Sequence, residues 1–146
     1  MSGSDPIISI ITPSFNRADE LEHLYNSLSQ QTVEFSLFEF IISDDGSTDN
    51  TKELIENWQK ESPFHIKYIT QGNQGPGAAR NHGLEYADGK LILFIDSDCE
   101  AHPDWVKTIY REFQQDSFDA CGGPDRAKDD FTSLQKAIDF SMTSFF

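Results

Sequence analysis

Leu91-Ile-Leu-Phe-Ile-Asp-Ser-Asp98 is the stretch of this sequence that says most about the fold. Five consecutive apolar residues are typical of a strand buried on both faces, and we expect this one at the centre of a parallel sheet. Two aspartates follow, separated by one residue. Carboxylates this close repel each other unless a positive charge lies between them, and Mg²⁺ or Mn²⁺ supplies such a charge. The alternative is a solvated acidic turn.

Other apolar runs alternate with helical periodicity on both sides of this stretch. Strands are expected at residues 7–12, 38–42, 64–70, 91–95 and, as a short one, 118–121. Helices are expected at residues 18–31, 50–60, 78–88, 104–114 and from Asp130 or Thr132 onward. Pro13 is expected to stop the first strand, and Gly89 to end the third helix in the left-handed conformation. This alternation predicts an α/β fold, a mostly parallel sheet flanked by helices.

Length and composition favour one globular domain. A chain of 146 residues that is 37% apolar can bury a single core. Residues 1–6 are interpreted as a disordered start or a cloning remnant, and residues 7–146 as the domain. The apolar end at Phe145-Phe146 indicates that this domain is truncated at its C-terminus.

The net charge of −14 disfavours binding to nucleic acid or to an anionic membrane surface. No stretch approaches the about 18–20 apolar residues that cross a bilayer, so no membrane span is expected in this chain. Cys99 and Cys121 are interpreted as small buried side chains, which fits a reducing compartment. We therefore expect a cytoplasmic protein, at the inner face of the membrane if the full-length protein is anchored there. The four histidines are expected to be structural.

Candidate ligand-binding residues follow each of the first four predicted strands. In open parallel sheets, ligands bind at the carboxyl ends of the strands, so these residues are expected at one edge. They are Pro13, Phe15, Asn16, Arg17, Asp44, Asp45, residues 72–80, Asp96 and Asp98. The alternatives are ordinary structural roles. The aspartates at 44 and 45 could stabilise a helix start, Asp49 could cap it, and Arg80 could form an internal salt bridge.

Gly75-Pro-Gly-Ala-Ala-Arg80 looks at first like the beginning of a dinucleotide-binding fingerprint. It follows the third strand instead of the first, and Arg80 occupies a position that needs Gly or Ala. An exposed cation beside a helix start suits a phosphate or an acidic partner instead.

Four of these segments together resemble family 2 of the inverting glycosyltransferases. They are Ser9–Arg17, Ile41–Asp49, Gly75–Asn81 and Phe94–Asp98, in the family's order and spacing, and the resemblance covers about residues 7–125. It implies a GT-A fold, which is Rossmann-like, a UDP-, GDP- or dTDP-sugar donor, and Mn²⁺ or Mg²⁺. It also implies a role in polysaccharide or cell-envelope biosynthesis.

The resemblance also implies roles for individual residues. Pro13, Phe15 and either Asn16 or Arg17 would line the nucleoside pocket, and Asp45 would bond the base. Arg80 would approach the nucleotide and Asp96 the ribose or sugar. Asp98 would coordinate the metal, with Asp96 as a second candidate ligand. Gly122 and Gly123 match a backbone segment near the donor sugar.

The sequence departs from the family pattern at the general base. The family places an aspartate in a Glu-Asp motif further along, and no such motif is present, so no catalytic residue is assigned. We therefore expect either a metal-assisted transferase acting on a glycan, lipid-linked or protein acceptor, or a donor-binding module without transfer. A phosphatase of the haloacid-dehalogenase type is disfavoured, because that group needs Thr or Val at the position of Glu100.

Overall fold

The computed structural model describes residues 5–115. The chain divides into two units, residues 1–111 and 112–146, and everything below belongs to the first unit except the last residues of helix α4. The strands are β1 (Ile8–Ser14), β2 (Phe38–Asp44), β3 (His65–Thr70) and β4 (Leu91–Phe94). The helices are α1 (Ala18–Leu28), the short 3₁₀ helix η1 (Phe35–Leu37), α2 (Thr51–Glu61), α3 (Pro76–Glu85) and α4 (Trp105–Gln115). The strand expected at 118–121, the last helix, Cys121, Gly122 and Gly123 lie outside the described residues.

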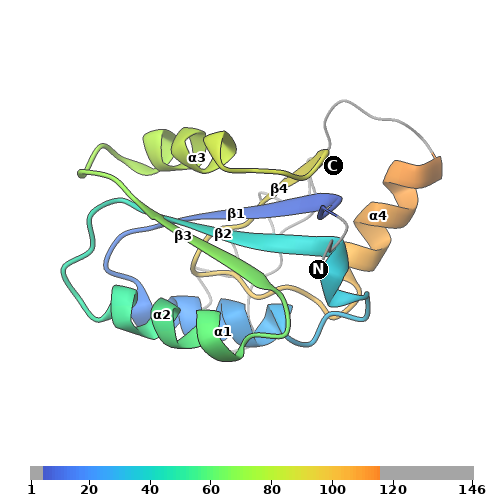
Figure 1. Cartoon of the computed structure of the whole chain (residues 1–146), viewed down its shortest axis with the longest axis horizontal. Helices are drawn as coiled ribbons and strands as arrows, with labels where there is room; N and C mark the ends of the chain where they lie inside the picture. Colours follow the sequence, from blue (N-terminus) through green and yellow to red (C-terminus); the bar gives the residue numbers. More distant parts are fainter. Residues whose placement is uncertain (1–4, 116–146) are drawn as a thin grey trace, which may run out of the picture. The chain divides into compact units, whose positions relative to one another are not determined.

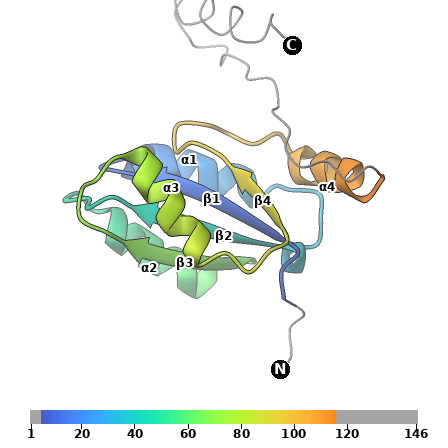
Figure 2. The ribbon, with the colours of Figure 1, turned by 90° about the horizontal axis from the view of Figure 1, so that it is seen from above.

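The four strands form one parallel sheet in the order β3-β2-β1-β4. They start nearly level, because Ile8 of β1 lies opposite both Phe38 of β2 and Leu91 of β4. Helices α1 and α2 lie on one face of the sheet and α3 on the other (Figures 1 and 2). The predicted class, a parallel sheet flanked by helices, is confirmed. Because all strands run the same way, their carboxyl ends share one edge.

Aromatic side chains fill the layer between the sheet and the helices α1 and α2. Phe64 packs against Phe38 and Phe40 of β2, with ring centroids 5.1 and 6.4 Å away. Tyr25 of α1 stacks on Trp58 of α2 at 4.3 Å. These rings are large apolar surfaces removed from water, and they fix the two helices side by side.

The opposite face is packed much more closely. A Cβ atom built on Gly83 of α3 would lie only 2.6 Å from Cγ2 of Ile11 in β1. Ala79, one turn earlier in α3, is fully buried. Small residues therefore let α3 approach the backbone of the sheet, and this holds the loop before α3 against the strand ends.

Among the described strands, residues 91–95 do not form the central strand that was predicted. Within residues 5–115, β4 pairs only with β1, and Phe94 is 47% exposed. The inner positions belong to β1 and β2, whose residues are all buried. An apolar run indicates a strand, but the crossover before it decides its neighbours. Here the chain passes from β3 through α3 to the far side of β1.

Pro13 does not stop the first strand, which continues to Ser14. The carbonyl of Ser14 accepts a hydrogen bond from the Asp45 backbone N–H, so Ser14 faces β2 and Pro13 faces the other way. On that side the pairing of β1 with β4 has already ended at Ile11. On that side the Ile95 carbonyl accepts from Thr12 Oγ1 at 2.8 Å, so it has a donor although Pro13 has no N–H.

Gly89 is also required for a different reason than predicted. Helix α3 ends at Glu85, and within the described residues the glycines with positive φ are Gly46 and Gly75. A Cβ on Gly89 would lie 2.5 Å from the backbone nitrogen of Ser9, so only glycine fits where the chain enters β4.

Helix α1 ends at Leu28 instead of residue 31, and the side chain of Gln31 bonds to the segment that begins α4. Its Nε2 donates to the carbonyl of His102 at 2.8 Å, and its Oε1 accepts from the Val106 N–H at 3.0 Å. Gln31 therefore supplies a cap for the first turn of α4, satisfying a backbone donor that the helix itself cannot pair.

Candidate functional site

Asp45 is a buried carboxylate at the carboxyl edge of the sheet. It follows β2 directly and is only 4% exposed. Its Oδ1 accepts hydrogen bonds from Gln71 Nε2 and the Gln74 N–H, both at 2.8 Å, and its Oδ2 accepts from the Gly75 N–H at 2.9 Å. Asp45 thus ties the end of β2 to the loop between β3 and α3.

These donors also set the charge state of Asp45. Burial alone raises the pKa of a carboxyl group, but the hydrogen bonds from Gln71, Gln74 and Gly75 outweigh it and hold the pKa of Asp45 below its ordinary value. Asp45 is therefore ionised at neutral pH. A carboxylate offers about four lone pairs and three donors are in place, so one acceptor position on Oδ2 is left for a ligand N–H or O–H.

Asn16 joins the loop after β1 to the loop after β2. Its φ of 52° lies in the left-handed region, which asparagine tolerates better than most residues. Its Oδ1 accepts from the N–H groups of Thr48 and Asp49 at 2.8 and 3.3 Å, and its own N–H donates to Ser47 Oγ. The side chain predicted to line the nucleoside pocket therefore also orders the loop before α2.

No specific partner of Asp44 was predicted from the sequence, and Tyr68 was not among the predicted site residues. Asp44 Oδ1 accepts from the Ser47 N–H at 3.0 Å, and Tyr68 Oη donates to Asp44 Oδ2. Burial, and then this hydrogen bond, raise the pKa of Tyr68 well above its ordinary value, so it stays a donor. The position of Tyr68 two residues before the end of β3 was the available signal. The N-cap residue of α2 is Asn50, and Asp49, one residue earlier, accepts at Oδ1 from the Thr51 N–H at 3.1 Å, so Asp49 does satisfy a donor at the helix start.

Arg80 and Asp96 link α3 to the loop after β4. Arg80 Nη2 lies 2.7 Å from Asp96 Oδ1, with the side chains 35% and 58% exposed. The alternative of an internal salt bridge is thus observed for Arg80. Asp98 lies two residues further along the chain and is exposed, and Cys99 Sγ lies 3.8 Å from its Oδ1. Cys99 itself is only partly buried, so the prediction of a small buried side chain is wrong there.

The donor set at this edge suits a hard cation that is bound together with its substrate. Residues 5–115 contain no group of three or more His, Cys, Asp or Glu side chains that could hold a metal alone. Mg²⁺ and Mn²⁺ do not need one, because they bind through one or two carboxylates and complete their shell with phosphate oxygens and water. Asp96 and Asp98, both exposed, are the predicted candidates for such a pair.

The remaining predicted residues lie near the same edge but differ in accessibility. Pro13 is buried inside β1, whereas Phe15 is 43% exposed. Arg17 pairs with Glu20 at 2.8 Å in the first turn of α1. A hollow of about 400 Å³ opens there. It is lined by Asn16, Arg17, Ala18, Asp19, Glu20, Asp49 and Asn50. Asn16 and Arg17 are thus at a surface that a ligand can reach.

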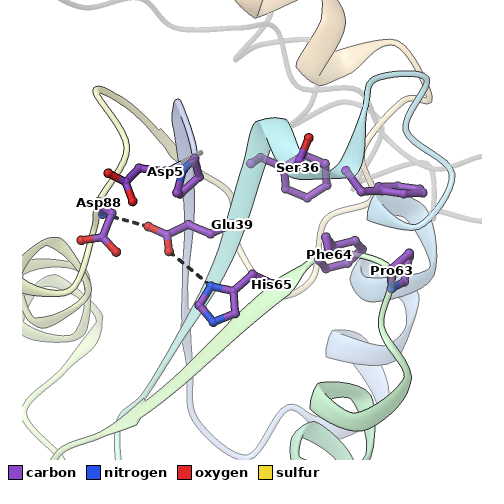
Figure 3. Close-up of a pocket in the computed structure, with 10 residues that line it drawn as sticks. Asp5, Ser36, Glu39, Pro63, Phe64, His65 and Asp88 are labelled. Atoms are coloured by element: carbon purple, nitrogen blue, oxygen red, sulfur yellow. Dashed lines mark hydrogen bonds and ion pairs between the residues drawn. The ribbon is translucent and has the colours of Figure 1, made fainter. Parts of the chain in front are cut away.

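A second hollow, of about 380 Å³, lies at the opposite edge, where the strands begin (Figure 3). Its acidic side chains are Asp5, Glu39 and Asp88, and aromatic rings line the other side. Glu39 is completely buried, yet it accepts from Ser9 Oγ at 2.6 Å and from the Asp88 N–H at 2.8 Å. Lys67 Nζ lies 2.7 Å from its Oε2. Both oxygens of this carboxylate therefore have partners within the fold.

Comparisons with known proteins agree with this architecture. A sequence model described as "Glycosyl transferase family 2" matches residues 9–146. The chain is 41% identical over 109 residues to the GalNAc(5)-diNAcBac-PP-undecaprenol beta-1,3-glucosyltransferase of Campylobacter jejuni. That match covers 73% of this chain and 34% of the relative.

Two solved structures show the same fold. TarS residues 1–349 of S. aureus, solved in complex with UDP-GlcNAc, has a TM-score of 0.70 and 28% identity, covering 81% of this chain and 37% of that one. Glucosyl-3-phosphoglycerate synthase of Mycobacterium tuberculosis, solved with Mn²⁺, UDP and glucosyl-3-phosphoglycerate, has a TM-score of 0.57 and 26% identity. That likeness covers 74% of this chain and 39% of the synthase. The predicted GT-A fold is confirmed.

The chain spans roughly a third of the length of these relatives, from 34% to 39%. Among residues 5–115, none of the helices is long and apolar enough to pass through a bilayer.

Proposed function

This chain belongs to glycosyl transferase family 2, and we propose that it binds a nucleotide-diphosphate sugar and transfers the sugar to an acceptor hydroxyl with inversion. The observation that carries the proposal is the linkage of separate strand ends at one edge of the sheet. Asn16 reaches the loop after β2, Asp45 reaches the loop after β3, and Arg80 reaches the loop after β4. Ligands of open parallel sheets bind at such an edge.

Each residue has a role that its position supports. The free acceptor position on Asp45 would take an N–H of the base, and Phe15 would offer an apolar wall beside it. Asn16 and Arg17 border the hollow next to these groups. Pro13, buried below, would support this wall from within β1. Arg80 would approach the nucleotide, and Asp96 the ribose or the sugar.

Asp98, with Asp96, would hold Mn²⁺ or Mg²⁺. When bound, such an ion would neutralise charge on the diphosphate leaving group. The relative from Mycobacterium tuberculosis, whose structure contains Mn²⁺ and UDP, supports a divalent ion here. A positive charge is needed in any case, because the chain carries a net charge of −14 and the diphosphate is also negative.

The transfer breaks one bond and forms another at the anomeric carbon. The acceptor hydroxyl gives its proton to a general base, its oxygen attacks the anomeric carbon, and the bond to the diphosphate oxygen breaks with departure of the nucleoside diphosphate. Attack from the face opposite the leaving group inverts the configuration. Residues 5–115 contain no carboxylate that we assign as this base.

The acceptor and the location are proposed from the relatives. The Campylobacter jejuni relative is named for a glucosyl transfer to an undecaprenol-linked glycan. We propose a lipid-linked glycan as the acceptor class, a hexose or its derivative as the transferred sugar, and action at the cytoplasmic face of the membrane in cell-envelope biosynthesis.

Isothermal titration with UDP and GDP, with and without Mn²⁺ or Mg²⁺, tests the donor site. We expect one of the two nucleotides to bind and the divalent ion to tighten its binding. The Lys60→Gln variant is the control, because it changes an exposed charge at the far end of α2. If neither nucleotide binds under any of these conditions, the proposed site is wrong.

A sugar-transfer assay on the same samples separates the two forms of the proposal. Release of nucleoside diphosphate that depends on a lipid-linked acceptor supports a complete transferase. Metal-dependent nucleotide binding without any transfer supports the alternative, a donor-binding module.

A further inference from the structure

We propose that Arg80 makes metal binding depend on the nucleotide, by occupying Asp96 until a diphosphate arrives. This rests on the proposed function. In the structure the Arg80 guanidinium lies 2.7 Å from Asp96 Oδ1, so one of the two carboxylates proposed to hold the cation already has a positive partner. A divalent ion without nucleotide must therefore bind beside a positive charge.

The position of Arg80 in α3 keeps this charge in place. Its neighbour Ala79 is fully buried against the sheet, and Asp45 holds the N-terminal end of the helix through Gly75. Arg80 is therefore carried by a fixed helix, and only its side chain has to move. The side chain is 35% exposed, which leaves it able to turn toward a ligand at the same edge.

The net effect of Arg80 on metal binding changes when a diphosphate is present. Without it, the guanidinium repels a divalent cation near Asp96 and Asp98. With it, the phosphate oxygens attract the guanidinium and the cation together, and Arg80 exchanges a carboxylate for a phosphate partner. Arg80 thus lowers the affinity for the metal alone and raises the affinity for metal and nucleotide together.

Thermodynamic linkage makes this coupling measurable from either side. The factor by which nucleotide tightens metal binding equals the factor by which metal tightens nucleotide binding. Removal of the Arg80 charge should reduce that factor for two reasons. The metal alone would bind more tightly, and the metal together with nucleotide would bind more weakly. A residue that merely stabilised the loop would weaken both affinities together.

The experiment measures free Mn²⁺ by electron paramagnetic resonance, with and without whichever of UDP and GDP binds. For Arg80→Gln we expect Mn²⁺ alone to bind about three- to fivefold more tightly, as for the loss of one exposed charge interaction. We expect the nucleotide, at saturating Mn²⁺, to bind about tenfold more weakly or worse, because a charge-assisted hydrogen bond is lost.

Two further variants serve as controls. Arg80→Lys keeps the charge and should leave the affinity for Mn²⁺ alone close to that of the wild type. Lys60→Gln removes the same charge from the far end of α2 and should change neither affinity. Circular dichroism verifies that every variant is folded.

Unchanged or weaker binding of Mn²⁺ alone to Arg80→Gln would overturn the inference, even if nucleotide binding falls. That result leaves the proposed function intact as long as the wild type binds metal and nucleotide together. If the wild type binds neither, the donor site itself is wrong and the inference falls with it.

Discussion

The two edges of the sheet both carry clustered carboxylates, and Glu39 at one edge differs in burial and pairing from Asp96 and Asp98 at the other. At the edge where the strands begin, Glu39 has no exposed surface and has Lys67 as a close positive partner. At the edge where the strands end, Asp96 is 58% exposed, and its partner Arg80 is itself open to solvent. Asp98, beside it, is exposed as well.

This difference separates structural acids from acids available to a ligand. Burial of an ionised carboxylate is costly unless hydrogen bonds and a counter-charge compensate it, and Glu39 has both. Lys67 also contacts Asp88 at 2.6 Å, so it neutralises two acids of that edge. At the other edge the negative charge is left partly uncompensated, which is the condition for attracting a cation. The presence of acidic residues in the sequence would not by itself have distinguished the structural carboxylates from those available to a ligand.

The largest expected effect comes from breaking the buried cluster. Glu39→Ala leaves Lys67 without its buried partner and the Ser9 hydroxyl without its acceptor. We expect the free energy of unfolding, measured in urea, to fall by about 3–5 kcal/mol. Glu39→Gln, which keeps an acceptor oxygen, should lose less. A loss below about 1 kcal/mol for the alanine variant would show that this cluster is not structural.

Asp98→Asn tests the opposite edge. We expect it to abolish the effect of Mn²⁺ on nucleotide binding and to leave the unfolding free energy within about 0.5 kcal/mol of the wild type, as for other exposed positions. The matched control is Asp88→Asn, the same substitution at the other edge. That variant should be less stable, because Lys67 loses a partner, and should keep its metal dependence. Metal dependence that survives in Asp98→Asn means that the ion binds elsewhere.

A moderate effect is expected from Asp45→Ala. It removes the acceptor proposed for the base and frees the loop that begins at Gln71, so nucleotide affinity in calorimetry should fall by about 1–3 kcal/mol. Gln71→Ala removes only one of the three donors to Asp45 and should have a smaller effect. An unchanged dissociation constant in Asp45→Ala would exclude this residue from the nucleotide site.

The smallest effect is on the pH dependence of stability. The pKa of Asp88 lies below its ordinary value of 3.8 because Lys67 donates to it, and hydrogen bonds outweigh burial to lower that of Asp45. A lowered pKa contributes stability above about 3.8 that is lost as the pH falls through the folded value. Urea unfolding between pH 6 and about 2.5 should therefore show an acid loss, with a shallower slope in Asp88→Asn. An identical slope in that variant would contradict this assignment.

The contribution of Lys67 to stability depends on pH in the opposite direction. Burial alone would lower the pKa of Lys67, but Asp88 and Glu39 raise it above the ordinary 10.5. The stability it contributes is complete below that value and is lost as the pH rises through the folded pKa. The same network at the amino edge therefore limits stability at both extremes of pH.

The sequence was sufficient for the class of fold and for the edge where the site lies. Alternating strands and helices imply parallel strands with their ends together, so residues as distant as Asn16 and Asp96 had to lie at one edge. Local capping was equally accessible, since the interaction of Asp49 with the start of α2 joins residues two positions apart. Such contacts depend on spacing alone.

The tertiary structure decided everything that depends on which elements become neighbours. It placed β4 beside β1 at the edge of the described sheet, and it made Gly89 necessary by bringing its backbone against Ser9. It also gave the buried Glu39 a counter-charge, and it gave Arg80 a counter-charge that is exposed to solvent. Charge patterns in a sequence report which groups are present, whereas burial and distance determine which charges are neutralised. That balance leaves Asp96 and Asp98 open to a cation and keeps Glu39 within the fold.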